Sequence, residues 1–382
     1  MNARGIHLQY SFRSDKLGHG QRGADMQNPL FDLLSAIAEH GSIQHAAKSM
    51  GASYRHVWGS CKQWEDALGE PLLHWVQGQP ARLTPFAERL LWAEKRARSR
   101  LVPHIEALRA ELERVLAEAL DGTQQVLSVH ASHDLALPLL RDQASASHRL
   151  HIELKFGGSM DALRALAEGR CAVAGFHVPP LAHNRTHFAR GLKPLLKPGQ
   201  HKLIGCMQRT QGLMVAHGNP LGLRDMADLV TRGARYINRQ QGSGTRLLAD
   251  HLLAEQGRTP DDIAQYFDSS EDSHLAVAAA VAAGVGDAAL GIEAAARSFG
   301  LDFVPLVTED YFLVCMAPTL ERPAVQALRA VLQQGAWADA LATLPGYRAA
   351  LPGEVLSLTR ALPWWQFRTP KRLDPSAVSL QR

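Results

Sequence analysis

The stretch Ile237-Asn238-Arg239-Gln240-Gln241-Gly242-Ser243-Gly244-Thr245-Arg246 decides how we interpret the second half of this 382-residue chain. An apolar, strand-like approach ends in a turn of Gly, Ser and Thr, and the periodic apolar residues of Leu247–Leu253 predict a helix that starts there. The first backbone N–H groups of a helix have no partner inside it and lie at the positive end of the helix dipole. The stretch therefore predicts a seat for a small anion.

Length and composition indicate an ordinary globular protein of two or three domains. The net charge of +4 permits contact with nucleic acid but does not establish it. Neither a transmembrane-length apolar run nor a signal-peptide core occurs in the sequence, so we expect a cytoplasmic protein. The four cysteines are scattered without a C-x-x-C pair, which indicates reduced thiols and predicts no metal site.

Changes in pattern along the chain predict an α+β multidomain fold in five segments. In the α/β part we expect short strands alternating with helices, including separate strands at Leu203–Met207 and Leu213–Ala216 and one closing helix over Pro323–Leu341. The segments are a flexible tail over 1–27 with a possible strand at Ile6–Phe12, a winged helix-turn-helix over 28–85, a linker helix over 86–122, a two-lobed α/β domain over 123–365 and a basic tail over 366–382.

Two helices joined by a tight turn predict the helix-turn-helix. The first of the two starts after Ser42 and stops at Gly51, and the second starts at Ser53 and buries apolar residues at a spacing of three and four. Two short apolar runs then flank the turn Gln77–Pro80, which predicts a β-hairpin wing. The alternative is an ordinary helical subdomain with solvated basic residues.

The linker helix carries an apolar seam at a spacing of three and four. A helix this long cannot bury its seam against a small wing domain, so we expect a homodimer or tetramer that reads a near-palindromic site on double-stranded DNA. Pro103 predicts a kink or break near Ser99–Val102, and an intramolecular helical hairpin is the alternative. The seam residues are Leu90, Ala93, Ala97, Leu101, Ile105, Leu108, Leu112, Val115, Leu116 and Ala119.

The α/β domain contains four strand-to-helix junctions with Ser or Thr at the helix start. One such junction is an ordinary helix cap. Four of them, placed so that they could converge on one cleft, favour an oxyanion site built from hydroxyl and amide donors. The junctions are Val126–His133, Phe156–Ser159, Ile237–Arg246 and Asp272–His274.

The first quarter of the chain resembles the winged helix-turn-helix of molybdate-responsive regulators of the ModE type, which are close kin of the LysR-type regulators. Gly41-Ser42-Ile43, Ala46-Ala47, Ser53-Tyr54-Arg55 with Trp58, and Leu83-Thr84 carry the resemblance. It implies DNA contacts from Gln44, Ser53, Tyr54, Arg55, His56, Ser60, Lys62, Gln63 and Arg82.

Most of 123–365 resembles the type II periplasmic-binding-protein fold found in intracellular regulators and molybdenum-cofactor enzymes. The resemblance lies in Ala174–His177, Asn238–Arg246, Ser273–Ala278 and Gly291–Glu293. It implies that molybdate or tungstate binds here, with formate as the alternative. The implied contacts are Ser132, His133, Gly158, Ser159, His177, Arg239, Gly242, Ser243, Gly244, Thr245, Arg246, Ser273 and His274, each of which could instead be structural.

These inferences favour a ligand-responsive transcription regulator over two rivals. The resemblance implies control of genes for molybdenum uptake or for molybdoenzymes such as formate dehydrogenase. A molybdenum-cofactor biosynthesis enzyme is the first rival, but the sequence has no Walker motif and no dinucleotide fingerprint. A transport binding protein is the second. We therefore expect no catalytic residues and no required cofactor.

Overall fold

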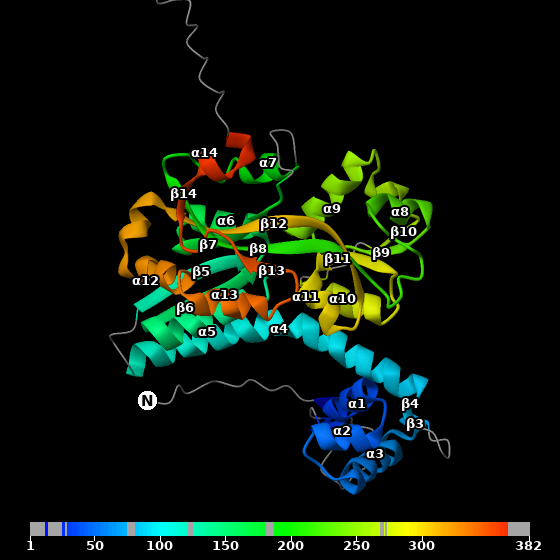
Figure 1. The fold of residues 1–382 in the computed structure, drawn as a ribbon. Coiled ribbons are helices and arrows are strands. Elements are labelled where there is room, and N and C mark those ends of the chain that lie inside the picture. Colours follow the sequence, from blue (N-terminus) through cyan, green and yellow to red (C-terminus); the bar gives the residue numbers. More distant parts are fainter. Residues whose placement is uncertain are drawn as a thin grey trace, which may run out of the picture.

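The computed structural model describes residues 12–13, 25–26, 29–74, 81–120, 125–180, 187–267, 271 and 273–365 (Figure 1). Of the predicted strand Ile6–Phe12, only Phe12 falls within this part, in β1 (Phe12–Arg13), which pairs with β2 (Asp25–Met26). The wing turn Gln77–Pro80, the boundary at 121–123 and the tail 366–382 lie outside the described residues.

Local signals in the sequence fix the helix-turn-helix. It consists of α1 (Pro29–His40), α2 (Ile43–Ser49) and α3 (Tyr54–Leu68). The side chains of Ser42 and Ser53 accept the backbone N–H groups of His45 and His56, which caps α2 and α3 as predicted. β3 (Leu73–His74) and β4 (Arg82–Leu83) pair antiparallel as the stem of the wing.

The linker helix α4 (Pro85–Leu120) begins in the core of the helix-turn-helix, where Ala87 and Leu91 are buried. It then runs along the α/β domain, where it contacts α10 and β6 (Figure 1). Of the predicted kink or break near Ser99–Val102, the break does not occur, because α4 remains one helix through Pro103. Its course bends, in line with the predicted kink, so that its two halves run in different directions (Figure 1).

One ten-stranded sheet forms the α/β domain. The order along the sheet is β10-β9-β11-β8-β12-β7-β5-β6, and β13 and β14 also pair with β8. Parallel strands occupy both ends, and the long antiparallel strands β8 and β12 join them. The strands are β5 (Gln125–Ser132), β6 (Leu150–Gly157), β7 (Val173–Val178), β8 (His201–Val215), β9 (Arg235–Ile237), β10 (Gln265–Phe267), β11 (Ala288–Ile292), β12 (Asp302–Met316), β13 (Tyr347–Ala349) and β14 (Val355–Ser357).

The predicted pair of strands at 203–207 and 213–216 is wrong, because β8 is one strand. Polar residues between the two apolar runs suggest a turn, yet Arg209 and Gln211 stay within the sheet. Both side chains donate to Oε1 of Glu309 on the neighbouring strand β12, so their donor groups find an acceptor inside the protein.

Helices cover both faces of the sheet, with one hydrophobic core on each. Figure 1 shows α6, α7 and α9 on one face and α5, α10, α12 and α13 on the other. The predicted closing helix over 323–341 is two helices, α12 and α13. The helices are α5 (Leu137–His148), α6 (Ser159–Ala167), α7 (His187–Leu192), α8 (Met226–Thr231), α9 (Gly244–Glu255), α10 (His274–Ala282), α11 (Glu293–Ser298), α12 (Pro323–Leu332), α13 (Gly335–Ala342) and α14 (Leu358–Ala361).

Candidate ligand site and nucleic-acid interface

A small cavity lies where the predicted strand-to-helix junctions meet. Its volume is only about 10 Å³, roughly the space that one water molecule needs. Ser132 ends β5, Gly157 ends β6, and the first turns of α6, α9 and α10 supply most of the other residues. The lining consists of Ser132, His133, Gly157, Gly158, Ser159, His177, Arg239, Ser243, Gly244, Thr245 and His274.

Three residues that the resemblance implied as contacts do not line this cavity. Gly242 forms the turn before α9 with a φ of 82°. Arg246 donates through Nη1 to the carbonyl of Arg239 at 3.3 Å, and Ser273 caps α10. Gly157 lines the cavity although the sequence did not single it out. Whether any of these residues binds an effector stays a prediction.

Two glycines let the halves of the domain approach closely. A Cβ atom at Gly158 would lie 2.7 Å from the carbonyl oxygen of Gly242, across the cavity. A Cβ atom at Gly244 would lie 2.1 Å from Nε2 of His177. No larger residue fits either position without movement of the backbone or of the histidine, so the described arrangement is a closed one.

Several buried polar atoms around the cavity have no hydrogen-bond partner among the described residues. They are Nδ1 of His133, Oγ of Ser159, Nε2 of His177 and Nδ1 of His274. All four side chains are almost completely buried. Because an unsatisfied buried polar group costs about 1–3 kcal/mol, four of them around one cavity are typical of a binding site for a polar ligand.

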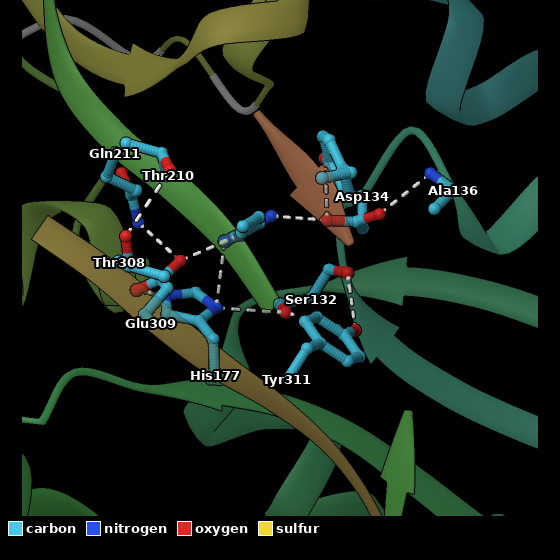
Figure 2. A network of polar contacts seen from close by, with 11 residues as sticks. Ser132, Asp134, Ala136, His177, Thr210, Gln211, Thr308, Glu309 and Tyr311 are labelled. Carbon is cyan, nitrogen blue, oxygen red and sulfur yellow. Dashed lines mark hydrogen bonds and ion pairs between the residues drawn. The ribbon is translucent and has the colours of Figure 1, made fainter. Parts of the chain in front are cut away.

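A buried ionic network holds His177 in place (Figure 2). Arg209 donates to Asp134 at 2.5 Å, to Glu309 at 2.7 Å and to Nδ1 of His177 at 3.1 Å. A guanidinium can only donate, so Nδ1 of His177 accepts, and the proton of the neutral ring is on Nε2. His177 therefore presents an N–H donor next to Gly244 and the cavity.

The three histidines of the cavity are neutral at physiological pH. Burial, and then the positive charges of Arg239 and Arg209, lower the pKa of His133 to about 3. The same causes place the pKa of His177 and of His274 well below 6.5. The cavity thus combines neutral imidazoles with the cationic Arg239, and its lining contains no carboxylate.

The ionic network was missed at the level of sequence. Asp134, Arg209 and Glu309 are fully buried, and Tyr347 also donates to Asp134 at 3.0 Å. Arg209 and Glu309 lie within strands and Asp134 follows β5, and no local pattern in the sequence pairs the three residues. A buried charge of this kind requires a partner, and here the partners come from distant segments.

In a second, wider hollow, several polar side chains already have hydrogen-bond partners. It is lined by Gln208, Thr210, Thr308, Gly346, Tyr347 and Arg348. Gln208 donates to Asp310 at 2.6 Å, and the hydroxyls of Thr210 and Thr308 lie 3.4 Å apart, so these polar groups already have partners. Among the described residues, no group of three or more His, Cys, Asp or Glu side chains could hold a metal ion.

The helix-turn-helix places most of the predicted DNA contacts at its surface. Gln44, Ser53, Tyr54, Arg55, His56, Lys62, Gln63 and Arg82 are exposed, and Ser60 is half-buried. Tyr54 stacks on Trp58 with ring centres 6.5 Å apart. Lys62 has an internal partner, because its Nζ lies 2.5 Å from Glu65 and 5.1 Å from the Trp58 ring centre. The DNA contacts of individual residues stay predictions.

Family models identify both modules. Residues 141–333 match the model described as the PBP superfamily domain. The chain belongs to this superfamily. Residues 30–88 match the model of the bacterial regulatory helix-turn-helix proteins of the lysR family. The chain therefore has the domain composition of a LysR-family DNA-binding transcriptional regulator with a PBP-like effector domain. None of the described helices is both long and apolar enough to cross a membrane.

Similar proteins include YvgK of Bacillus subtilis (strain 168), named as uncharacterized, which is 32% identical over 202 residues. The match covers 53% of this chain and 64% of YvgK, less than two thirds of that protein. A hydrogen peroxide-bound OxyR mutant from Corynebacterium glutamicum is 17% identical, with 82% and 94% of the two chains covered and a TM-score of 0.41. A probable transcriptional regulator from Pseudomonas aeruginosa is 18% identical, with 80% and 96% covered and a TM-score of 0.41.

Proposed function

We propose that this protein is a LysR-type transcriptional regulator whose PBP-like domain closes on a small oxyanion, with molybdate or tungstate as the expected ligand. The observation that carries the proposal is the buried cavity, whose polar atoms lack partners and whose lining contains no carboxylate. The resemblance to molybdate-responsive regulators adds to it. The regulated genes would then serve molybdenum uptake or molybdoenzymes such as formate dehydrogenase.

The donors around the cavity suit an anion. The first turns of α6 and α9 point free backbone N–H groups and the positive ends of two helix dipoles toward it. Nε2–H of His177 and the hydroxyl of Ser159 add neutral donors, and Arg239 adds charge. Each hydrogen bond to a charged ligand contributes roughly 1.5–3 kcal/mol, so a few of them offset the desolvation of a small anion.

The same donors would also serve a small carboxylate, so formate is the second candidate ligand. The small volume of the cavity favours either ion over a larger aromatic or sugar-derived acid. Ligand binding would alter the relative placement of the two DNA-binding modules in a dimer, and thereby their fit to a near-palindromic operator.

Thermal shift measurements with molybdate, tungstate, formate and sulfate test this proposal. We expect molybdate or tungstate to raise the melting temperature most, because a ligand that binds only the native state stabilises it. A larger rise with formate would identify the carboxylate as the ligand. If none of these ions moves the melting temperature, the anion site is refuted.

A further inference from the structure

We propose that Glu271 and Ser273 are positioning residues that connect the ligand cavity to the linker helix α4. The two residues lie between β10 and α10. The backbone carbonyl of Glu271 binds Arg239, and the side chains of Glu271 and Ser273 bind α4. The inference rests on the proposed function, because it takes the cavity to be a ligand site. It adds a defined route by which the cavity acts on the DNA-binding module.

The carboxylate of Glu271 is fully buried against α4. Arg100 donates to it through Nε at 2.9 Å and through Nη2, and Arg96 donates through Nη2 at 3.2 Å. Burial alone would raise the pKa of Glu271, but the bonds from Arg100 and Arg96 lower it. The carboxylate is therefore ionised, and removing either arginine would leave a buried charge with fewer partners.

The second contact uses a carbonyl that Pro103 leaves without its helical partner. In an α-helix the carbonyl of residue 99 accepts the N–H of residue 103, and proline has no N–H. Oγ of Ser273 donates to the carbonyl oxygen of Ser99 at 3.3 Å. The α/β domain thus satisfies a backbone group of α4 that the helix itself cannot satisfy.

On the cavity side, the backbone carbonyl of Glu271 accepts two bonds. The N–H of Gln240 donates to it at 3.1 Å, and Nε of Arg239 donates to it at 3.3 Å. Arg239 lines the cavity, as does His274, the residue after Ser273. Glu271 therefore binds α4 through its side chain and the cavity wall through its backbone.

This geometry joins the cavity to the DNA-binding module through rigid elements. The first turns of α4 are packed into the core of the helix-turn-helix through Ala87 and Leu91. The ring centres of Trp92, the next residue, and Phe299 lie 6.3 Å apart, and Arg96, one turn further on, donates to Glu271. An anion that draws the guanidinium of Arg239 toward itself pulls on the carbonyl of Glu271, and so on the contact with α4.

Hydrogen exchange of the full-length protein tests the route, with sodium molybdate as the probe. In the wild type we expect molybdate to slow exchange of the backbone amides of residues 92–102 by about fivefold or more, the lower end of usual coupling between sites. In parallel, the melting temperature reports whether molybdate binds. A shifted melting temperature with unchanged exchange in α4 overturns this inference and leaves the ligand site standing.

The variant Arg100→Gln, with Arg98→Gln as its matched control, separates coupling from simple stability. Arg98 is an exposed arginine of the same helix. We expect Arg100→Gln to bind molybdate more weakly and to lose the response of α4, whereas Arg98→Gln keeps both. Without any ligand, Arg100→Gln should also speed exchange of the Gln240 amide, because its acceptor is the carbonyl of Glu271. Unchanged exchange at Gln240 overturns the proposal whatever molybdate does.

A third variant, Pro103→Ala, changes a residue of α4 and leaves every residue of the cavity lining unaltered. The alanine supplies an N–H to the carbonyl of Ser99, which then competes with the bond from Ser273. We expect the melting temperature to respond to molybdate as in the wild type, while the response of exchange in α4 becomes smaller. An undiminished response in α4 contradicts the role assigned to Ser273.

Discussion

Nη2 of Arg209 lies 3.1 Å from Nδ1 of His177, and this contact decides which ring nitrogen of His177 carries the proton. Arg209 is held from behind by Asp134 and Glu309, so it cannot turn away from the imidazole. With Nδ1 accepting from Arg209, Nε2 of the neutral ring carries the proton. His177 offers a donor and no acceptor to whatever occupies the cavity.

This donor predicts selectivity against protonated oxyanions. Molybdate, tungstate and sulfate carry no proton at neutral pH, whereas hydrogen phosphate must donate one. We expect hydrogen phosphate to bind about tenfold more weakly than molybdate, because every oxygen of molybdate can accept a hydrogen bond, whereas the P–OH group needs one of the few acceptors of the lining. In His177→Gln the side-chain amide can turn its oxygen to the ligand, so the preference should shrink. Titration calorimetry measures both affinities, and equal binding of the two ions by the wild type would contradict this prediction.

The buried histidines predict a pH dependence of stability in the ligand-free protein. The pKa of His133 is lowered to about 3, mainly by burial, but the unfolded chain protonates this residue near pH 6.5. Between these values the unfolded state binds more protons, so the free energy of unfolding falls as the pH drops below about 6.5 and is level above it.

The variant His133→Asn should show a shallower loss of stability with falling pH, by up to about 1.4 kcal/mol per pH unit. Urea denaturation at several pH values measures the two slopes. Parallel curves for the variant and the wild type would show that His133 is not held neutral.

The double variant Ser243→Ala with Thr245→Ala should abolish stabilisation by molybdate, because it removes two hydroxyls from the cavity lining. Ser243 also caps α9, so the variant loses about 1 kcal/mol of stability as well. Ser42→Ala is the matched control, since it removes the cap of α2 far from the cavity. The control should melt earlier and still respond to molybdate. A full response in the double variant would refute the assigned contacts.

Arg55→Ala should weaken binding to operator DNA by roughly 1–3 kcal/mol and relax the sequence preference at one base position. Arg55 is exposed in the first turn of α3, where no acidic residue neutralises it. Gel-shift titrations at several salt concentrations measure the effect. Asp66→Ala on the same helix removes a charge of the opposite sign and should not weaken binding. Unchanged affinity of Arg55→Ala excludes Arg55 from the interface.

The second half of α4 predicts self-association. Leu108, Leu112 and Val115 are 55%, 46% and 50% exposed in the single chain, at positions that share one helix face. Leu108→Glu with Leu112→Glu should therefore shift the protein from dimer or tetramer toward monomer in sedimentation experiments. Glu111→Gln, an exposed change between them, should leave the assembly intact. An unchanged sedimentation profile of the double variant would place the interface elsewhere.

The helix-turn-helix could be predicted from the sequence because its signals are local. Ser42 and Ser53 cap the helices that follow them, and Gly51 and Gly69 adopt the left-handed conformation that ends a helix. Strand β8 could not be predicted in the same way. Its polar residues suggest a turn until Glu309 of β12 is placed beside them.

The helix start at Gly242–Arg246 could be predicted by itself, as could the other Ser-bearing helix starts, because helix capping involves neighbours three residues apart. What the sequence determined was thus a set of helix N-termini with hydroxyls and imidazoles, joined to a helix-turn-helix. Their meeting at one cavity depends on the strand order, which no local pattern encodes. The bond between Arg100 and Glu271 joins residues 171 positions apart, and only packing of α4 on the α/β domain brings them together.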